Sequence, residues 1–549
     1  MPTLPHIFLK YCLVAIGIFW AAGAKAQKDS TTSINITTEY QPVLRNAVKL
    51  NFSGTALPAD STRTVAAYSI PPQNLFYAYQ PIPLRPLALV QDTNLYLGNR
   101  NFVKAGIGNY STGYARAGLG FGDGKKYLLN VTGDFVSSKG KAIEFQNFYN
   151  LNAKAAGSYF LPQNELYGSL SISKNDYHRY GYDHTAYNYS KADVVQHLQD
   201  FSISAGLRNT AENDYGINYN PQLGIDFYAS VDNLNERTLR ASLPAEKSFS
   251  KKISASAEIK ADLTRYSTTG YIPNNFIFNN NIIQLLPSVK YNGDAFQINA
   301  GIIPTWDNGH FSLLPNIVGE AFLPDKNFSL QAGIVGALYK NTYRNLSLQN
   351  PFLLHGNTQV NTKETEIYGG LKTTVGKHFN LFAKVGILSY NDFALFINDT
   401  ATDSKGFLIS YEPTAGNLRI HADASYLLQD KLSLNASLTM NGYTGFDVNQ
   451  KAWHTLPMEF NGSVRYWPFK KLLLKADLLM FSAPKYIEKG GAHDFTGNAS
   501  DLSLGAEFTI NRQFSAWLNA NNLFNNKYER WHNYPVYGLN VLGGIIVRF

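Results

Sequence analysis

Residues 253–263, ISASAEIKADL, alternate without exception between apolar and polar side chains. A period of two places successive side chains on opposite faces of an extended strand, one face dry and one wet. The same alternation recurs over residues 432–440 and 502–510. The dry face of such strands packs either on the core of a soluble sandwich or on lipid.

The spacing of the connections favours strands whose apolar face contacts lipid. Ten short turns occur near residues 123, 163, 211, 245, 293, 325, 376, 430, 469 and 512. The connections between them are longer, polar and rich in glycine and aromatics, as in residues 174–193, 396–406, 441–454 and 482–501. A soluble sandwich has no reason to keep every second connection short. Outer-membrane barrels have short periplasmic turns and long outer loops.

Two strands per short turn, with a first strand near 101–110 and a last near 537–549, give about 22 strands. In lipid every backbone N–H and C=O must be paired, so such strands must close. We therefore predict an all-β fold, a transmembrane antiparallel up-and-down β-barrel of residues 99–549. In this reading the polar residues Glu258, Lys260, Asp262 and Glu507 face the lumen.

Composition agrees with a membrane barrel. Charged residues make up 16% of the chain, against about 25% in typical globular proteins, and aromatics make up 14%. Polar lumens and aromatic girdles produce this balance. The net charge of +8 is not concentrated in a basic cluster with a recognition motif, so nucleic acid is not an expected partner.

The N-terminus reads as a signal peptide of residues 1–26. Lys10 precedes the apolar run 11–22, and Ala24-Lys25-Ala26 forms a small-x-small cleavage site before Gln27. Residues 27–98 hold seven prolines and predict extended chain. Two roles stay open for this segment: a reduced plug in the lumen, or a periplasmic tether that binds a periplasmic protein.

No enzyme chemistry is predicted. Cys12, the only cysteine, lies in the apolar run of the signal, and the sequence has no nucleophile elbow, zinc-protease motif or P-loop. We expect neither a cofactor nor a bound metal. A Tyr- and His-rich stretch holds the outer-loop ligand candidates His178, Tyr180, Tyr182 and His184. Such side chains either stack on a sugar or hold a metal chelate, or they simply form a Tyr-rich loop.

The chain stops on an aromatic residue, and alternate positions before it are apolar or glycine: Leu539, Val541, Gly543, Ile545, Val547 and Phe549. Such a strand suits the end of a barrel, where it pairs with the first strand. It resembles the signal read by the outer-membrane barrel assembly machinery, which we expect as a partner together with outer-membrane lipid.

The segment before this strand resembles the end of TonB-dependent receptors in their Bacteroidetes form. The matching elements are Asn522-Leu523-Phe524-Asn525, Lys527-Tyr528 and Tyr534-Pro535-Val536-Tyr537-Gly538. The resemblance implies a barrel in the outer membrane of a Gram-negative bacterium. The family's N-terminal plug is not recognised here, and residues 34–40 (INITTEY) match its energy-coupling box only weakly. Binding of the energy-coupling protein therefore stays open.

Three functions follow from this reading. The first is uptake or passage of a solute across the outer membrane, as the resemblance implies. The second is a structural or assembly barrel that anchors a periplasmic or surface partner. The third is a passive porin. The sequence does not name a substrate.

Overall fold

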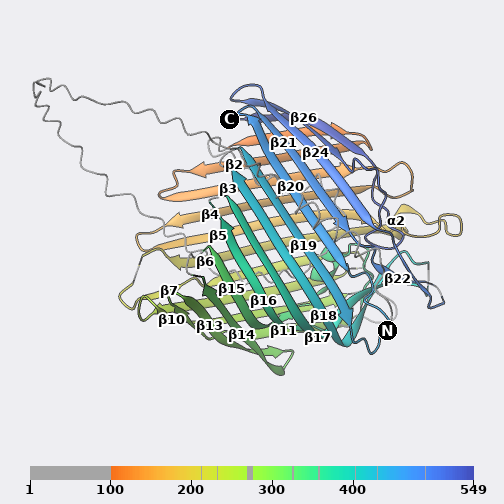
Figure 1. The fold of residues 1–549 in the computed structure, drawn as a ribbon. Coiled ribbons are helices and arrows are strands. Elements are labelled where there is room, and N and C mark those ends of the chain that lie inside the picture. The colour runs from red at the N-terminus through yellow and green to blue at the C-terminus, as the bar shows by residue number, and fades with distance from the viewer. Residues whose placement is uncertain are drawn as a thin grey trace, which may run out of the picture. The chain divides into compact units, whose positions relative to one another are not determined.

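The computed structural model describes residues 101–549, apart from 212, 232, 269–275, 324–326, 357–358, 377, 402, 429–430 and 489. These residues form one closed antiparallel barrel (Figure 1). The signal peptide, its cleavage site at Ala26 and Gln27, and the proline-rich segment 27–98 lie outside the described residues.

The wall consists of 24 strand segments that make 22 strands, which confirms the predicted fold class. The first half of the wall comprises β1 (Phe102–Gly108), β2 (Thr112–Gly122), β3 (Tyr127–Ser138), β4 (Phe148–Phe160), β5 (Asn164–His178), β6 (Val195–Asn209), β7 (Ile217–Tyr219), β8 (Gln222–Ala229), β9 (Asn235–Ser248), β10 (Ile253–Thr268), β11 (Phe276–Leu285) and β12 (Ser288–Asn292). The second half comprises β13 (Phe296–Asp307), β14 (His310–Phe322), β15 (Phe328–Tyr339), β16 (Thr362–Val375), β17 (Phe379–Asn398), β18 (Phe407–Leu428), β19 (Leu432–Thr444), β20 (Met458–Phe469), β21 (Leu472–Phe481), β24 (Ala499–Thr509), β25 (Phe514–Asn521) and β26 (Asn540–Arg548).

Two of the 22 strands are interrupted at a proline. Pro221 separates β7 from β8, and Pro287 separates β11 from β12. Proline has no N–H to donate to the ladder, so the strand breaks locally at each site. The carbonyls of both prolines still accept neighbouring N–H groups, from Leu207 at 3.0 Å and from Ile302 at 3.3 Å. The wall therefore stays continuous across both breaks.

The short turns lie at one end of the barrel. They occupy the positions predicted from the sequence, with one exception. The turn predicted near residue 245 lies at 249–252, because β9 continues to Ser248. Pro244 stands inside that strand, opposite Glu258 of β10, and its carbonyl accepts the N–H of Asn220 at 3.4 Å. A proline is tolerated in a strand where no ladder bond needs its nitrogen. A proline near the end of a strand therefore locates the following turn only approximately.

The barrel closes between its first and last strands. Phe102–Gly108 pairs with Leu542–Arg548, and Gly106 stands opposite Gly544. The Trp517 ring reaches over this seam from β25, and its Nε1 donates to the Ala105 carbonyl at 3.2 Å. A Cβ on Gly106 would lie 2.3 Å from that ring. Glycine is therefore required for the tryptophan to cover the seam.

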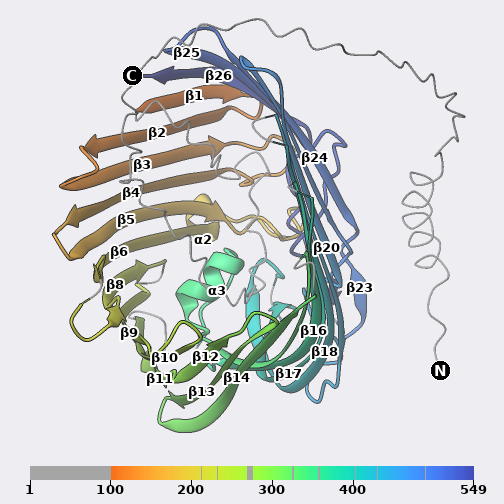
Figure 2. The same cartoon turned by 60° about the vertical axis from the view of Figure 1, so that its left-hand side comes forward.

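The alternation of β10 separates two surfaces. Ile253 and Ile259 are exposed on the outside, whereas Thr264 and Tyr266 are buried on the side of the bore. Two short helices, α2 (Lys191–Val194) and α3 (Tyr343–Gln349), and a small hairpin of β22 (Lys485–Ile487) and β23 (His493–Phe495) belong to the long connections. Figure 2 shows α3 inside the ring of strands. In the described part of the chain, the helices fall short of what a membrane-spanning helix needs.

Candidate functional site at the loop end of the barrel

The loop between β25 and β26, residues 522–539, contains the family-like motif. Asn522 has a positive φ of 51°, and its Nδ2 donates to the carbonyls of Asn526 and Tyr537, both at 2.8 Å. Asn525 also has a positive φ of 51°, and its Oδ1 accepts the Leu539 N–H at 3.0 Å. Asparagine tolerates this conformation and bonds to nearby backbone. The two motif asparagines therefore fix the course of the loop.

Other residues of the motif bind this loop to its neighbours. The Tyr528 hydroxyl donates to the buried Asp501 carboxylate at 3.1 Å. The Pro535 carbonyl accepts from the Tyr180 hydroxyl at 3.1 Å and from Gln146 Nε2 at 2.9 Å. The motif thus connects three outer loops that are far apart in the sequence.

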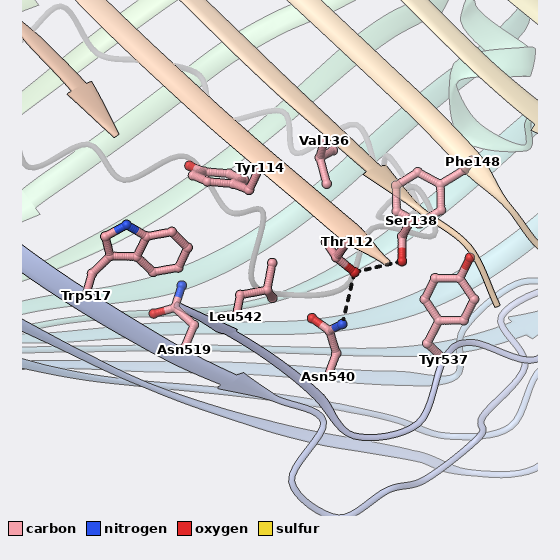
Figure 3. A pocket seen from close by; sticks show the side chains of 10 residues that line it. All are labelled: Thr112, Tyr114, Val136, Ser138, Phe148, Trp517, Asn519, Tyr537, Asn540 and Leu542. Carbon is pink, nitrogen blue, oxygen red and sulfur yellow. Dashed lines mark hydrogen bonds between the residues drawn. The ribbon is translucent and has the colours of Figure 1, made fainter. Parts of the chain in front are cut away.

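A pocket lies beneath this loop, on the inner side of the seam (Figure 3). Thr112 Oγ1 bonds to Ser138 Oγ at 2.9 Å and accepts from Asn540 Nδ2 at 3.3 Å. The pocket is lined by Thr112, Tyr114, Val136, Ser138, Phe148, Trp517, Asn519, Tyr537, Asn540 and Leu542.

A second pocket adjoins the first and shares three of its residues, Phe148, Tyr537 and Asn540. Its lining includes His178, whose Nε2 is buried without a hydrogen-bond partner, and the carboxylate of Asp501. The residues that line the two pockets include neither lysine nor arginine. Aromatic faces and side-chain amides therefore dominate the chemistry of both.

Residues 340–361, here called the crossing loop, connect β15 to β16. The loop leaves the wall and contains α3, whose first turn is capped by Thr342 Oγ1 accepting the Asn345 N–H at 3.2 Å. Its later part reaches the loop that precedes β18, where the Leu354 N–H donates to the Phe407 carbonyl at 2.8 Å. The crossing loop therefore contacts walls on both sides of the bore.

Aromatic packing joins the crossing loop to the other outer loops. Phe352 stacks on Tyr534 with ring centroids 3.6 Å apart, and Tyr180 packs edge-on against both. The buried core at this end takes residues from four outer connections and from strand ends: Tyr180, Leu198, Tyr228, Leu234, Tyr266, Tyr343, Leu346, Phe352, Leu353, Phe396, Phe407, Trp531 and Tyr534. Loops from different sides of the barrel thus meet in one core across its mouth.

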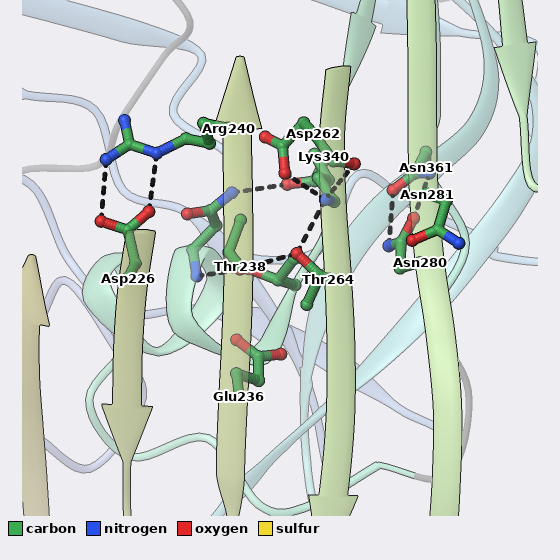
Figure 4. Close-up of polar contacts among 12 residues, drawn as sticks. Asp226, Glu236, Thr238, Arg240, Asp262, Thr264, Asn280, Asn281, Lys340 and Asn361 are labelled. Atoms are coloured by element: carbon green, nitrogen blue, oxygen red, sulfur yellow. Dashed lines mark hydrogen bonds and ion pairs between the residues drawn. The ribbon is translucent and has the colours of Figure 1, made fainter. Parts of the chain in front are cut away.

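Two ion pairs hold the crossing loop to other strands of the wall. Arg344 makes a two-pronged contact with Asp200 of β6, Nε to Oδ1 at 2.9 Å and Nη2 to Oδ2 at 2.6 Å. Lys340 pairs with the Asp262 carboxylate of β10, and its Nζ also donates to Thr264 Oγ1 at 2.8 Å (Figure 4). Paired charges of this kind are stronger than neutral hydrogen bonds.

Neutral and charge-assisted hydrogen bonds extend this attachment. The Glu236 carboxylate of β9 accepts the first N–H groups of α3, from Tyr343 at 2.7 Å and Arg344 at 2.9 Å. These N–H groups have no partner inside a helix, so the carboxylate satisfies them. Ser347 Oγ bonds to the Tyr228 hydroxyl at 2.7 Å. At the end of the loop, Asn361 and Asn280 exchange two amide hydrogen bonds of 2.9 and 2.7 Å (Figure 4).

The four residues predicted to face the lumen all make polar contacts. Glu258 accepts from Ser242 at 2.7 Å and lies 3.2 Å from Lys260. Asp262 pairs with the crossing loop, and the buried Glu507 binds Arg548 at 2.7 Å. The structure thus brings one of the four, Asp262, into the candidate site.

The four predicted outer-loop ligand residues lie in two places. His178 and Tyr180 line the second pocket, and Tyr180 also belongs to the buried core. Tyr182 and His184 stack on each other, with ring centroids 4.1 Å apart, outside that pocket lining. The sequence analysis did not identify the crossing loop. Its length could have revealed it, since residues 340–361 form a polar, aperiodic connection that is longer than a hairpin needs.

Two histidines in the outer loops are held neutral. Burial lowers the pKa of His454 to about 3 and that of His532 to about 4. The His454 Nδ1–H donates to the Phe396 carbonyl at 2.8 Å, and Arg530 binds the His454 carbonyl at 2.7 Å. His532 stacks on Tyr486 with ring centroids 3.5 Å apart. Among the residues that the structure describes, no group of three His, Cys, Asp or Glu could hold a metal ion.

Comparison with protein families and with curated proteins finds no match. Solved structures do match. The FrpB iron transporter from Neisseria meningitidis is 10% identical, with a TM-score of 0.64 over 82% of this chain and 81% of its own. The copper transporter OprC is 13% identical, with a TM-score of 0.62 over 82% and 80%. The pyoverdine outer membrane receptor FpvA from Pseudomonas aeruginosa is 12% identical, with a TM-score of 0.62 over 82% and 78%.

These structures share the fold of this chain. They are named as transporters and receptors.

Proposed function

We propose that this chain passes a solute across the outer membrane of a Gram-negative bacterium, as a barrel related to TonB-dependent receptors. The observation that carries the proposal is the ion-paired crossing loop inside a transporter-like barrel. Arg344 and Lys340 bind carboxylates of the wall strands β6 and β10. Water can replace these ion pairs when the loop moves, whereas the packing of Phe352 on Tyr534 holds the loop in place at rest. The crossing loop is therefore suited to act as a gate.

The two pockets beneath the loops indicate what kind of solute fits. Their linings supply aromatic faces, amides, one imidazole and the Asp501 carboxylate, but no cationic side chain. One cation nevertheless stands beside the first pocket, because Lys104 Nζ lies 4.6 Å from the centroid of the Trp517 ring. We therefore propose a polar solute that stacks on aromatic rings and bonds to side-chain amides. The names of the similar structures, which include iron, copper and pyoverdine, leave a metal complex among the candidates.

The biological setting forms part of the same proposal. The motif that ends in Gly538 supports a Bacteroidetes source, the apolar outer face supports contact with outer-membrane lipid, and the terminal strand supports insertion by the barrel assembly machinery. Residues 27–98 would either enter the bore in place of a plug or bind a periplasmic protein. Dependence on an energy-coupling protein is to be measured directly, through ligand uptake with and without that protein.

One observation favours a second function. The outer loops pack into a core that includes the fully buried Trp531 and Tyr534, and such a sealed mouth also suits a barrel that anchors a partner. In that case the charged pairs of the interior would serve stability alone. A passive porin, in contrast, would need an open mouth at rest.

Single-channel conductance in planar bilayers separates these functions. The mature protein is compared with a variant lacking residues 27–98, each with and without Arg344→Ala. A gated transporter predicts a silent parent, with openings when the ion pair is broken and the segment is removed. A porin predicts equal conductance in all four proteins. Silence in all four, together with co-purification of a stoichiometric partner, would support the anchoring barrel and overturn the transporter.

A further inference from the structure

The turn end of the barrel carries a concentration of positive charge along one part of its rim. Four turns contribute to it: 123–126, the turn that ends at 431, 470–471 and 510–513. Their exposed cations, here called the basic arc, are Lys125, Lys126, Lys431, Lys470, Lys471 and Arg512.

Backbone hydrogen bonds place these turns side by side. Trp467 N–H donates to the Lys431 carbonyl at 2.8 Å, and Thr509 N–H donates to the Lys471 carbonyl at 2.7 Å. The arc then continues over the seam, because Arg548 N–H reaches the Gln513 carbonyl at 2.7 Å. From there, Phe549 N–H donates to the Asn101 carbonyl at 3.1 Å, and Gly120 N–H to Asn101 Oδ1 at 2.9 Å, which leads to the turn 123–126. The basic arc is therefore one continuous stretch of rim.

Positive charge exceeds negative charge in the arc, since its four turns hold six cations and two acidic residues, Asp430 and Asp123. Within the parts of these turns that the structure describes, the acidic side chain is that of Asp123. Its carboxylate accepts the N–H groups of Lys126 at 2.8 Å and Lys125 at 2.9 Å, and these bonds lower its pKa. The ionised Asp123 thus fixes the turn and holds both lysines at its tip.

Exposed aromatic side chains stand next to the cations. They are Phe121, Tyr127, Tyr466, Phe469, Phe514 and Phe549. Aromatic rings of this kind mark the boundary between hydrocarbon and headgroups in membrane barrels. The lysines beside them therefore lie at headgroup depth, where a long side chain can extend its ammonium toward a phosphate.

Most of the remaining rim differs, although the turn 376–378 beside the arc contains Lys377 and His378. The turn 161–163 (Leu-Pro-Gln) has no charge, and the turns near Asp214 and Asp294 carry carboxylates. Lys251 and Lys252 form a second basic turn, but Lys252 lies 3.9 Å from Asp294 and thus has an acidic neighbour. These two lysines provide a matched control for the arc.

We propose that the basic arc binds anionic phospholipid headgroups of the leaflet at the turn end. Several exposed lysines along one membrane-facing rim recognise clustered phosphates, and each basic residue near an anionic surface adds to the attraction. The inference rests on the outer-membrane placement proposed above, but not on transport. Anchoring of this kind would hold the seam strands at a fixed depth in the bilayer.

Native mass spectrometry of the full chain in detergent, titrated with POPG, cardiolipin and POPC, tests the proposal. We expect the wild type to retain POPG and cardiolipin at least ~10-fold more strongly than POPC at low salt, with a loss as salt rises. The K125Q/K126Q/K470Q/K471Q variant should lose this preference. K251Q/K252Q should keep it.

Heat-modifiable gel migration reports folding of each variant separately, and conductance reports the proposed transport. Three results would overturn the lipid site: no preference for anionic lipid in the wild type, an unchanged preference in the folded quadruple variant, or an equal loss in K251Q/K252Q. Failure of transport alone leaves the lipid result valid, since the two readouts are independent.

Discussion

Breaking the ion pair between Arg344 and Asp200 should loosen the crossing loop by a measurable amount. Both side chains are partly shielded, with 24% and 16% of their surfaces exposed, and the contact is two-pronged. Charge-assisted hydrogen bonds contribute about 1.5–3 kcal/mol. For Arg344→Ala we take about 2 kcal/mol, which raises the open fraction of the loop about 30-fold.

Cysteine labelling measures that fraction directly, because the sequence has no cysteine beyond Cys12. Ser347 is fully buried in α3, whereas its neighbour Leu348 is 42% exposed. In an S347C background a maleimide reacts only when the loop opens, so the rate follows the open fraction. L348C provides the rate for an accessible position. We expect R344A to accelerate the labelling of S347C about 30-fold and to leave that of L348C unchanged.

Two controls make the outcome decisive. Glu366→Gln breaks the pair with Lys384, an ion pair of 2.8 Å between β16 and β17 in which no residue of the crossing loop takes part, and should not change the labelling. The exchange D200R/R344D should restore slow labelling, because the pair is re-formed with opposite polarity. Equal labelling rates in R344A and its parent, or equal acceleration by E366Q, would show that the Arg344–Asp200 pair does not hold the loop closed.

Three further predictions concern the seam, the C-terminal loop and pH. Trp517→Ala leaves a cavity over the seam glycines and should lower the free energy of unfolding by about 3–5 kcal/mol, read from urea midpoints in lipid vesicles. Asn522→Ala removes two 2.8 Å hydrogen bonds and a favourable left-handed residue, and should raise protease cleavage within 522–539 without unfolding the barrel. His532 and His454 are neutral in the packed loops, because burial lowers their pKa values. Their contribution to the stability of the loops is therefore complete above about pH 6.5 and is lost as the pH falls toward 4. For His532 the loss of stability is about 3 kcal/mol. The labelling rate of S347C, divided by that of L348C at the same pH so that the falling thiolate fraction cancels, should rise over the same range. A ratio that stays flat from pH 7 to 4 would contradict this account.

The wall of the barrel could be predicted from sequence because its signal is local. Alternation in residues 253–263 decides which side chains point outward, and turn residues at intervals decide where strands reverse. The turn near residue 245 was predicted too early for a local reason. Pro244 lies inside β9, at a position where the strand needs no N–H donor.

The candidate site could not be predicted in the same way, because distant contacts create it. Arg344 and Asp200 are 144 residues apart, and no periodic pattern relates them. Tyr180 shows a different difficulty. A tyrosine in a polar loop carries the same local signal whether its ring stacks on a ligand or packs in a core, and here it takes part in the core while also lining a pocket.

The closed mouth also has a consequence for the order of folding. Phe352 stacks on Tyr534, which lies 182 residues further along the chain (534 − 352). Contacts with such long sequence separation carry a large loop-closure cost and form late. The crossing loop therefore finds its partner only after the C-terminal strands have joined the wall. Protection of the crossing loop from labelling would therefore indicate a closed barrel. Its exposure would indicate a barrel whose C-terminal strands have not yet paired.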